Sequence, residues 1–292
     1  MKQVCVLGSL HLDVIVNASN LPQIDETVVG SEVNYVFGGK GGNQALAADD
    51  HGANVYFIGR VGNDAFGENL LTTLRKSNID ISQVKQDTGA SGMSVAIVNQ
   101  QGDYGAVIVS QANLRIENKD VAILKNTGIL LLQNEVPEEI NLLASTKAIR
   151  EGSQVWLNAA PARKISKRLL NNLNVVIINK PEALYYGDLF VSDESNHIIK
   201  IFTLGSEGLE IQFPNKKREY HAAYSIDAQS SHGAGDMFVG ALAANYLKSY
   251  NFSDALKYAQ AAAAIKVSRN ATKRTSVRET DVFKFLRNHI IF

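Results

Sequence analysis

A short glycine-rich stretch, Gly233-Ala234-Gly235-Asp236, places one carboxylate at the start of an apolar helical pattern. The first amides of a helix have no partner within the helix, and small side chains let an anion approach them closely. A carboxylate cannot bind that anion, so we interpret Asp236 as a base. It would take a proton from a hydroxyl that attacks a phosphoryl group held by the amides. The alternative is that Asp236 only caps the helix and that the glycines form a tight turn.

A second glycine-rich stretch, FGGKGGNQALAA at residues 37–48, surrounds Lys40 with four glycines and also precedes a helical pattern. No Ser or Thr follows Lys40, and neither the P-loop spacing nor a dinucleotide-binding G-x-G-x-x-G is present. We predict that backbone amides here contact a polar ligand and that Asn43 adds a side-chain amide. The alternative is a flexible connection from a strand to a helix.

Several other polar side chains follow predicted strands, where open α/β sheets bind their ligands. Asp13 comes after the first strand and could accept two sugar hydroxyls, and His11 shares its face if the segment is extended. Glu135 ends another predicted strand. The stretches NKPEA (179–183) and TLGSEG (203–208) follow two more. Taken singly, each of these residues is equally well explained as a solvated strand end.

Other kinds of chemistry find little support. The six histidines are scattered without metal-ligand spacing, and no G-x-S-x-G elbow accompanies the adjacent Ser231 and His232. The formal net charge of +0 argues against nucleic acid as a partner. The single cysteine predicts a reducing compartment, and no apolar run approaches membrane-spanning length. We therefore expect a cytoplasmic protein with no membrane partner.

The elements expected to position these residues alternate between strands and helices. Strand-like runs occur at 4–7, 55–58, 129–132, 155–157, 175–178 and 199–204. Helical patterns occur at 43–51, 64–77, 138–150, 164–171, 236–247 and 253–268. This alternation predicts a mainly parallel sheet with helices on both faces. A chain of 292 residues, 45% of them hydrophobic, is suited to one such α/β domain spanning 1–292.

Two segments, at about 13–36 and 91–109, depart from this alternation. They contain alternating β-branched residues and turn residues but no helical pattern. We predict that they form antiparallel strands inserted into the α/β domain as a small lid. The exposed face of such a lid commonly seeks a partner.

These stretches, taken together and in this order, resemble the ribokinase family of carbohydrate kinases, the phosphofructokinase-B group. The resemblance covers essentially the whole chain through GSLHLD, FGGKGGNQA, IGRVGNDAFG, NAAPA, NKPEA, TLGSEG and GAGDMF. It implies a three-layer α/β fold with a β lid, often a homodimer joined through that lid. It also implies transfer of the ATP γ-phosphate to the primary hydroxyl of a pentose or related small sugar. Mg²⁺ would arrive with ATP.

The resemblance also implies a role for each matching residue. Asp236 would be the base, and the amides of Gly233, Ala234 and Gly235 the anion hole. The sugar would be surrounded by His11, Asp13, Gly39, Lys40, Gly41, Asn43 and Glu135. The nucleotide would be lined by Asn179, Glu182, Thr203, Gly205, Ser206 and Gly208. No residue would bind the metal directly, and Glu182 would reach it through water.

The sequence departs from the family pattern at three places. His11 stands where the family usually has asparagine, which weakens the expectation that the sugar is ribose. Ser230 and Ser231 stand at the usual Asp and Thr of a monovalent-cation site, and a later loop reads Arg269-Asn270-Ala271-Thr272. We therefore expect weak or absent potassium activation, with Lys266 as a candidate fixed cation. The segment between Glu182 and Thr203 is short and lacks a helical pattern.

Two alternatives to the sugar kinase stay open at this point. A nucleoside or pseudouridine-type kinase would need room for a base near Met93, Val95 and Ile97 of the lid. A non-catalytic paralogue would bind a sugar or nucleotide without turnover.

Overall fold

The computed structural model describes residues 2–101, 103–190, 192–229, 232–269 and 276–289. Its larger sheet consists, in spatial order, of β13 (Arg218–His221), β12 (Leu209–Gln212), β11 (Ile199–Thr203), β10 (Val175–Asn179), β9 (Gln154–Asn158), β8 (Thr127–Gln133), β1 (Gln3–Leu7), β4 (Val55–Gly62) and β5 (Asp80–Asp87). Neighbours from β11 to β5 pair in parallel. The edge strands β12 and β13 pair antiparallel.

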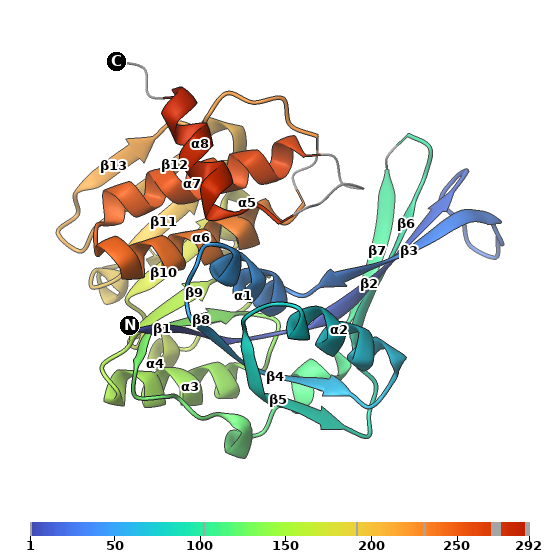
Figure 1. Cartoon of the computed structure of the whole chain (residues 1–292), viewed down its shortest axis with the longest axis horizontal. Coiled ribbons are helices and arrows are strands. Elements are labelled where there is room, and N and C mark those ends of the chain that lie inside the picture. The colour runs from blue at the N-terminus through green and yellow to red at the C-terminus, as the bar shows by residue number, and fades with distance from the viewer. Residues whose placement is uncertain (1, 102, 191, 230–231, 270–275, 290–292) are drawn as a thin grey trace.

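Helices cover both faces of this sheet, as predicted (Figure 1). Val4 and Val6 of β1 pack into one hydrophobic cluster, whereas Cys5 and Leu7 pack into the other, because successive side chains of a strand point to opposite faces. The first face is covered by α1 (Lys40–Asp50), α2 (Ala65–Arg75), α6 (Ala234–Ser249), α7 (Phe252–Ser268) and α8 (Glu279–His289). The second is covered by α3 (Glu138–Arg150), α4 (Lys167–Leu170) and α5 (Lys180–Tyr186). Among the described helices, none is both long and apolar enough to cross a bilayer.

The predicted lid strands form a separate small sheet that projects from the body (Figure 1). It contains β3 (Gly30–Gly38), β2 (His11–Ala18), β6 (Gly92–Val98) and β7 (Tyr104–Val109), in that order. Each hairpin is antiparallel, as predicted, whereas the two central strands β2 and β6 pair in parallel. The connections explain this parallel pairing. Strand β2 follows β1 and β6 follows β5, and β1 and β5 end at the same edge of the larger sheet.

Several predicted helix limits were also wrong. Helix α6 begins at Ala234 rather than Asp236, and α1 begins at Lys40 rather than Asn43. Each is preceded by a glycine with positive φ, 75° at Gly233 and 88° at Gly39. Glycine adopts this conformation without strain, so the backbone can turn sharply there and the helix begins at the next residue. The pattern at 164–171 yields only the four-residue α4. The short segment after Glu182 continues α5 to Tyr186 and then forms 3₁₀ turns.

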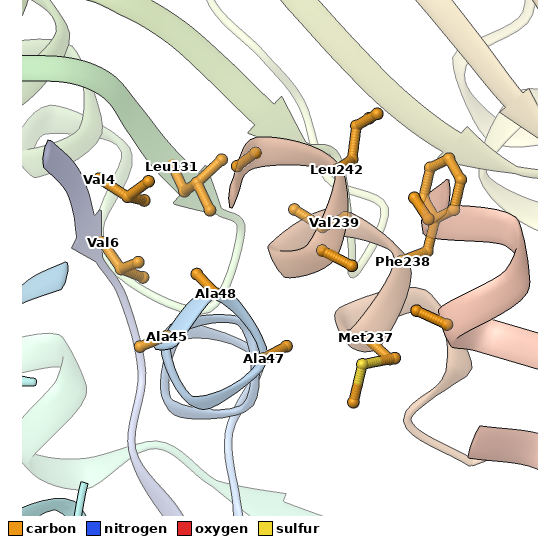
Figure 2. Close-up of a cluster of buried hydrophobic side chains, with 14 of the residues drawn as sticks. Val4, Val6, Ala45, Ala47, Ala48, Leu131, Met237, Phe238, Val239 and Leu242 are labelled. Atoms are coloured by element: carbon orange, nitrogen blue, oxygen red, sulfur yellow. The ribbon is translucent and has the colours of Figure 1, made fainter. Parts of the chain in front are cut away.

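Helix α1 packs closely against α6 (Figure 2). Helix α1 lies between β1 and α6, and the alanines Ala45, Ala47 and Ala48 fill the space between them. A Cβ on Gly240 of α6 would lie 2.5 Å from both the Ala47 Cβ and the Gln44 carbonyl oxygen. The two helices therefore pack closely because both surfaces are small.

Candidate active site

The candidate site lies at the carboxyl ends of β1 and β8, where the strand order of the sheet reverses. The loop after β8 supplies Glu135, whose Oε2 accepts a hydrogen bond from the Lys40 backbone amide at 2.9 Å and another from the Ser9 hydroxyl. Glycine is required at position 39, where φ is 88° and a Cβ would lie 2.7 Å from the Ser9 carbonyl oxygen. Glu135 thus joins the ends of β1 and β8 to the start of α1.

The sugar-side candidates meet at the base of the small sheet. Asp13 on β2 lies opposite Ser94 on β6, whose hydroxyl donates to Asp13 Oδ1 at 2.5 Å. A Cβ on Gly38 would lie 2.2 Å from Asp13 Oδ2, so glycine leaves room for this carboxylate. His11 Nδ1 lies 3.9 Å from Glu135 Oε2. The carboxylates of Asp13 and Glu135 thus both lie near the His11 imidazole.

Burial controls the charge of His11. The side chain is 3% exposed, and desolvation lowers its pKa despite the nearby carboxylates of Glu135 and Asp13. The imidazole is therefore neutral at pH 7. Its Nε2 is buried and has no hydrogen-bond partner among the described residues. His11 thus shapes the site as a neutral ring.

Asp236 occupies the third position of α6 and is buried. Gln44 Nε2 donates to Asp236 Oδ1 at 2.9 Å, and Gln133 Nε2 in turn donates to Gln44 Oε1 at 2.8 Å. Burial raises the pKa of Asp236 to about 6, opposed by the charge of Lys40 and by hydrogen bonds from Gln44 and Asn43. A pKa close to neutral suits a general base.

This pKa predicts the pH dependence of activity. Asp236 must be ionised to accept a proton, so kcat/KM is expected to fall about tenfold per pH unit below pH 6 and to level off above it. The measurement is a profile of kcat/KM from pH 5 to pH 9. A profile with no inflection between pH 5 and 7 would contradict the assignment of Asp236 as the base.

A cleft of about 170 Å³ opens beside Asp236. Its wall includes seven of the predicted residues: Lys40, Asn179, Glu182, Thr203, Gly233, Gly235 and Asp236. A Cβ on Gly235 would meet no atom within 4 Å, so the first turn of α6 opens directly into this space. Amides at a helix N-terminus that face an open cleft can receive a phosphoryl group.

The nucleotide-side candidates fall into two groups. Asn179 and Glu182 line the cleft and also form a capping box on α5, with both hydrogen bonds at 2.9 Å. Burial raises the pKa of Glu182. In contrast, Gly205 and Ser206 lie in a 3₁₀ turn that ends at Gly208, and these three do not line the cleft.

Among the described residues, no group of three or more His, Cys, Asp or Glu side chains is placed to hold a metal ion. Glu182 and Asn179 both line the cleft, and their side chains carry oxygen, the donor that Mg²⁺ prefers.

Some functional positions escaped sequence reasoning. Gln44 carried a signal, because it lies four residues after Lys40 and so shares its helical face. Ser9 and Asn158 lie within the matching stretches GSLHLD and NAAPA but were not singled out. Ser94 and Gln133 carried no signal, since sheet pairing brings them to the site from distant segments.

The lid residues at which a nucleoside's base would need room do not lie on the face of the small sheet that carries Asp13. Ser94 shares the face of Asp13, so its neighbours Met93 and Val95, and Ile97 beyond them, point to the other side of the sheet. Space around these three side chains cannot enlarge the site beside Asp13.

The departures from the family pattern are only partly visible. Ser230, Ser231, Asn270, Ala271 and Thr272 lie outside the described residues. Lys266 on α7 approaches the residue before α6, and its Cε lies 3.8 Å from the position that a Cβ on Gly233 would occupy.

Comparison with known proteins gives a consistent result. A model of the pfkB family of carbohydrate kinases matches residues 1–279. The ribokinase of Haemophilus influenzae is 29% identical over 306 residues, covering 98% of this chain and 99% of its own. The solved ribokinase of Thermotoga maritima is 27% identical with a TM-score of 0.88, covering 99% of this chain and all of its own. The Arabidopsis thaliana ribokinase, solved with ribose and ATP, shares the fold at 24% identity and a TM-score of 0.88, covering 98% of this chain and 99% of its own.

Proposed function

The chain belongs to the pfkB family of carbohydrate kinases, and we propose that the sugar it phosphorylates with ATP is ribose, at the primary hydroxyl. The observation that carries this is the buried Asp236 in the first turn of α6, beside amides that face an open cleft. The whole-length match to the Haemophilus and Thermotoga ribokinases supports ribose as the sugar. The nucleoside alternative is not favoured, because the lid side chains considered for a base point away from Asp13. We place the protein in the cytoplasm, where its single buried cysteine stays reduced.

In the proposed reaction, Asp13 and Glu135 accept hydrogen bonds from the sugar hydroxyls and orient the primary hydroxyl toward Asp236. Asp236 takes the proton from that hydroxyl as the hydroxyl oxygen attacks the γ-phosphorus. The bond between the γ-phosphorus and the oxygen that bridges to the β-phosphate breaks at the same time, and ADP leaves. The amides of Gly233, Ala234 and Gly235 stabilise the charge on the transferred group. Glu182 and Asn179 would hold Mg²⁺ through water, and the bound ion would supply neutralisation of the phosphate charge.

The test is ADP release by the purified protein with a panel of pentoses, hexoses and nucleosides. We expect the highest kcat/KM with ribose. Turnover only with nucleosides would overturn the choice of sugar. Sugar or nucleotide binding without turnover on any substrate would overturn the kinase activity and favour a binding protein.

We expect this activity to need no potassium. Ser230 replaces the usual carboxylate of the family's cation site, and Lys266 brings a positive charge close to Gly233. Activity in sodium-only buffer should therefore stay within about twofold of activity in potassium, and Lys266→Met should abolish it. Lys257→Met on the same helix is the control, because its side chain is exposed. A strong potassium requirement in the wild type would contradict this role of Lys266.

We further propose that the small sheet joins two copies of the chain. Side chains paired across its four strands share one face, and the central row of that face is entirely apolar: Tyr35, Val14, Val95 and Val107. Tyr35 is 57% exposed and Val107 66% exposed. An exposed apolar face of this kind marks an interaction site. The partner we propose is a second copy of the chain. Two copies related by a two-fold axis would bury the same apolar face of each against the other.

A charge on that face should dissociate the dimer. Val107→Glu is expected to give monomers at micromolar concentration, because burying an unpaired carboxylate is unfavourable. Ile108→Glu is the control, since Ile108 is 59% exposed but points to the opposite face. Sedimentation velocity measures the outcome. A monomeric wild type, or a dimer that survives Val107→Glu, would contradict the proposal.

A further inference from the structure

The connection between β1 and β2 is held by an asparagine from a distant part of the chain. Asn113 lies in a short 3₁₀ helix, η1 (Gln111–Arg115), which follows β7, and it is fully buried. Its Nδ2 donates to the Leu10 carbonyl oxygen at 2.9 Å, and its Oδ1 accepts from the Leu10 amide at 2.9 Å. One side-chain amide thus satisfies both backbone groups of a single residue.

Leu10 needs these bonds because neither sheet supplies them. Strand β1 ends at Leu7 and β2 begins at His11, so Leu10 lies between the two strands and is itself buried. Buried backbone groups that lose their partners are strongly unfavourable. The Leu10 backbone therefore follows the position of the Asn113 amide.

The packing around this contact leaves no room for a side chain at position 92. A Cβ on Gly92 of β6 would lie 2.2 Å from Asn113 Nδ2, 2.5 Å from His11 Cδ2 and 2.7 Å from the Leu10 carbonyl oxygen. The asparagine amide, the imidazole and the Leu10 carbonyl thus meet over one glycine. A shift of Asn113 would move the His11 ring and the start of the strand that carries Asp13.

The segment that carries Asn113 is fixed independently of this contact. Arg115 donates from Nε and Nη2 to the two carboxylate oxygens of Asp87, both at 2.9 Å. The Ala112 amide donates to the Ala90 carbonyl oxygen at 3.1 Å. These bonds fasten η1 to the segment after β5. They would persist if Asn113 were replaced, so its substitution should release Leu10 and leave η1 in place.

We propose that Asn113 is a positioning residue for sugar binding. Asn113 fixes the backbone of Leu10, and Leu10 in turn positions His11 and Asp13 on β2. Asn113 does not contact the sugar itself. The inference rests on the proposed function, because it assumes that Asp13 binds ribose. It predicts a selective loss: the sugar site is disturbed while the cleft beside Glu182 and Thr203 is not.

The test compares Asn113→Leu, which has a similar volume and no hydrogen-bonding groups, with the wild type. The dissociation constant and KM for ribose are expected to rise about tenfold or more, whereas KM for ATP stays within about twofold. Hydrogen–deuterium exchange should speed up in the peptide that contains Leu10 and stay unchanged in the peptides of the large sheet. Gly92→Ala keeps Asn113 but places a Cβ against its contact with Leu10, so it should also weaken ribose binding without affecting ATP. This variant replaces Asn113→Leu in the test if Asn113→Leu does not fold.

Ser153→Ala is the matched control. It removes another buried side-chain bond to the backbone, from Ser153 Oγ to the Thr127 carbonyl oxygen at 2.9 Å, at the opposite end of the sheet. It should leave the affinity for ribose unchanged. An equal loss of ribose and ATP affinity in a folded variant, or unchanged ribose affinity despite faster exchange at Leu10, would overturn the inference alone. A wild type that binds no ribose would overturn the proposed function and this inference with it.

Discussion

Replacing Asp236 with asparagine is expected to lower kcat by about 10²–10⁴-fold and to leave the affinity for ribose within about threefold. The asparagine side chain has the same shape and can still accept the hydrogen bond from Gln44, but it cannot take a proton from the sugar hydroxyl. A base acts in the transition state, so its loss appears in kcat rather than in ground-state binding. Steady-state kinetics with ribose and a separate binding measurement give the two quantities.

Asp254→Asn is the control for this prediction. Asp254 is the third residue of α7, as Asp236 is the third residue of α6. Each carboxylate therefore lies near the positive N-terminal end of its own helix dipole. If Asp236 only capped its helix, the two substitutions would have similar small effects. Near-normal kcat in Asp236→Asn would contradict its role as base.

The same substitution should stabilise the protein. The pKa of Asp236 is raised from 3.8 to about 6 in the folded state, so ionisation of this buried group opposes folding. The penalty is absent below pH 3.8, grows between the two values and is complete above pH 6. Two pKa units correspond to about 3 kcal/mol, which Asp236→Asn would recover in part at pH 8. Urea unfolding at pH 5 and pH 8 measures this difference.

A bulky side chain at Gly235, on the open side of the proposed anion hole, is the second substitution with a large expected effect. Gly235→Val should lower kcat/KM for ATP by about 10²–10³-fold, the size seen when one donor of such a hole is lost. Its side chain would extend into the cleft, where a Cβ on Gly235 meets no atom within 4 Å. Gly235→Ala should have a smaller effect of the same kind, so the loss follows the size of the side chain.

Stability separates this explanation from a folding defect. Gly235 lies within α6, where alanine is favoured over glycine by up to about 1 kcal/mol, so Gly235→Ala should unfold no more easily than the wild type. Gly233→Ala should instead destabilise the fold, because φ at Gly233 is 75°. Gly235→Ala and Gly235→Val variants with wild-type activity would show that no phosphoryl group approaches this turn.

The alternation of strands and helices in the sequence predicted the three-layer fold because the central strands are buried on both faces and appear as continuous apolar runs. Strand β5 was missed since its sequence, DISQVKQD, is half exposed at the sheet edge and carries charges. The strands β12 and β13 were missed because each has only four residues, and β13 is also partly exposed. Only pairing with a neighbour fixes such segments as strands.

The candidate site was predicted as a set of residue types at strand ends, and sheet topology brings most of them together. The contacts that tune those residues could not be predicted. Gln44 donates to Asp236 only because alanines and Gly240 let α1 and α6 pack closely. Ser94 meets Asp13 only because β2 and β6 pair in parallel in a register that no sequence pattern specifies.

The most direct test of the account is phosphorus NMR of the wild-type protein with ATP and ribose. A phosphate ester on the methylene carbon of the primary hydroxyl, formed in equal amount with ADP and lost in Asp236→Asn, is the predicted result. ADP without a sugar phosphate, or a phosphorylated ribose formed equally well by Asp236→Asn, would contradict it.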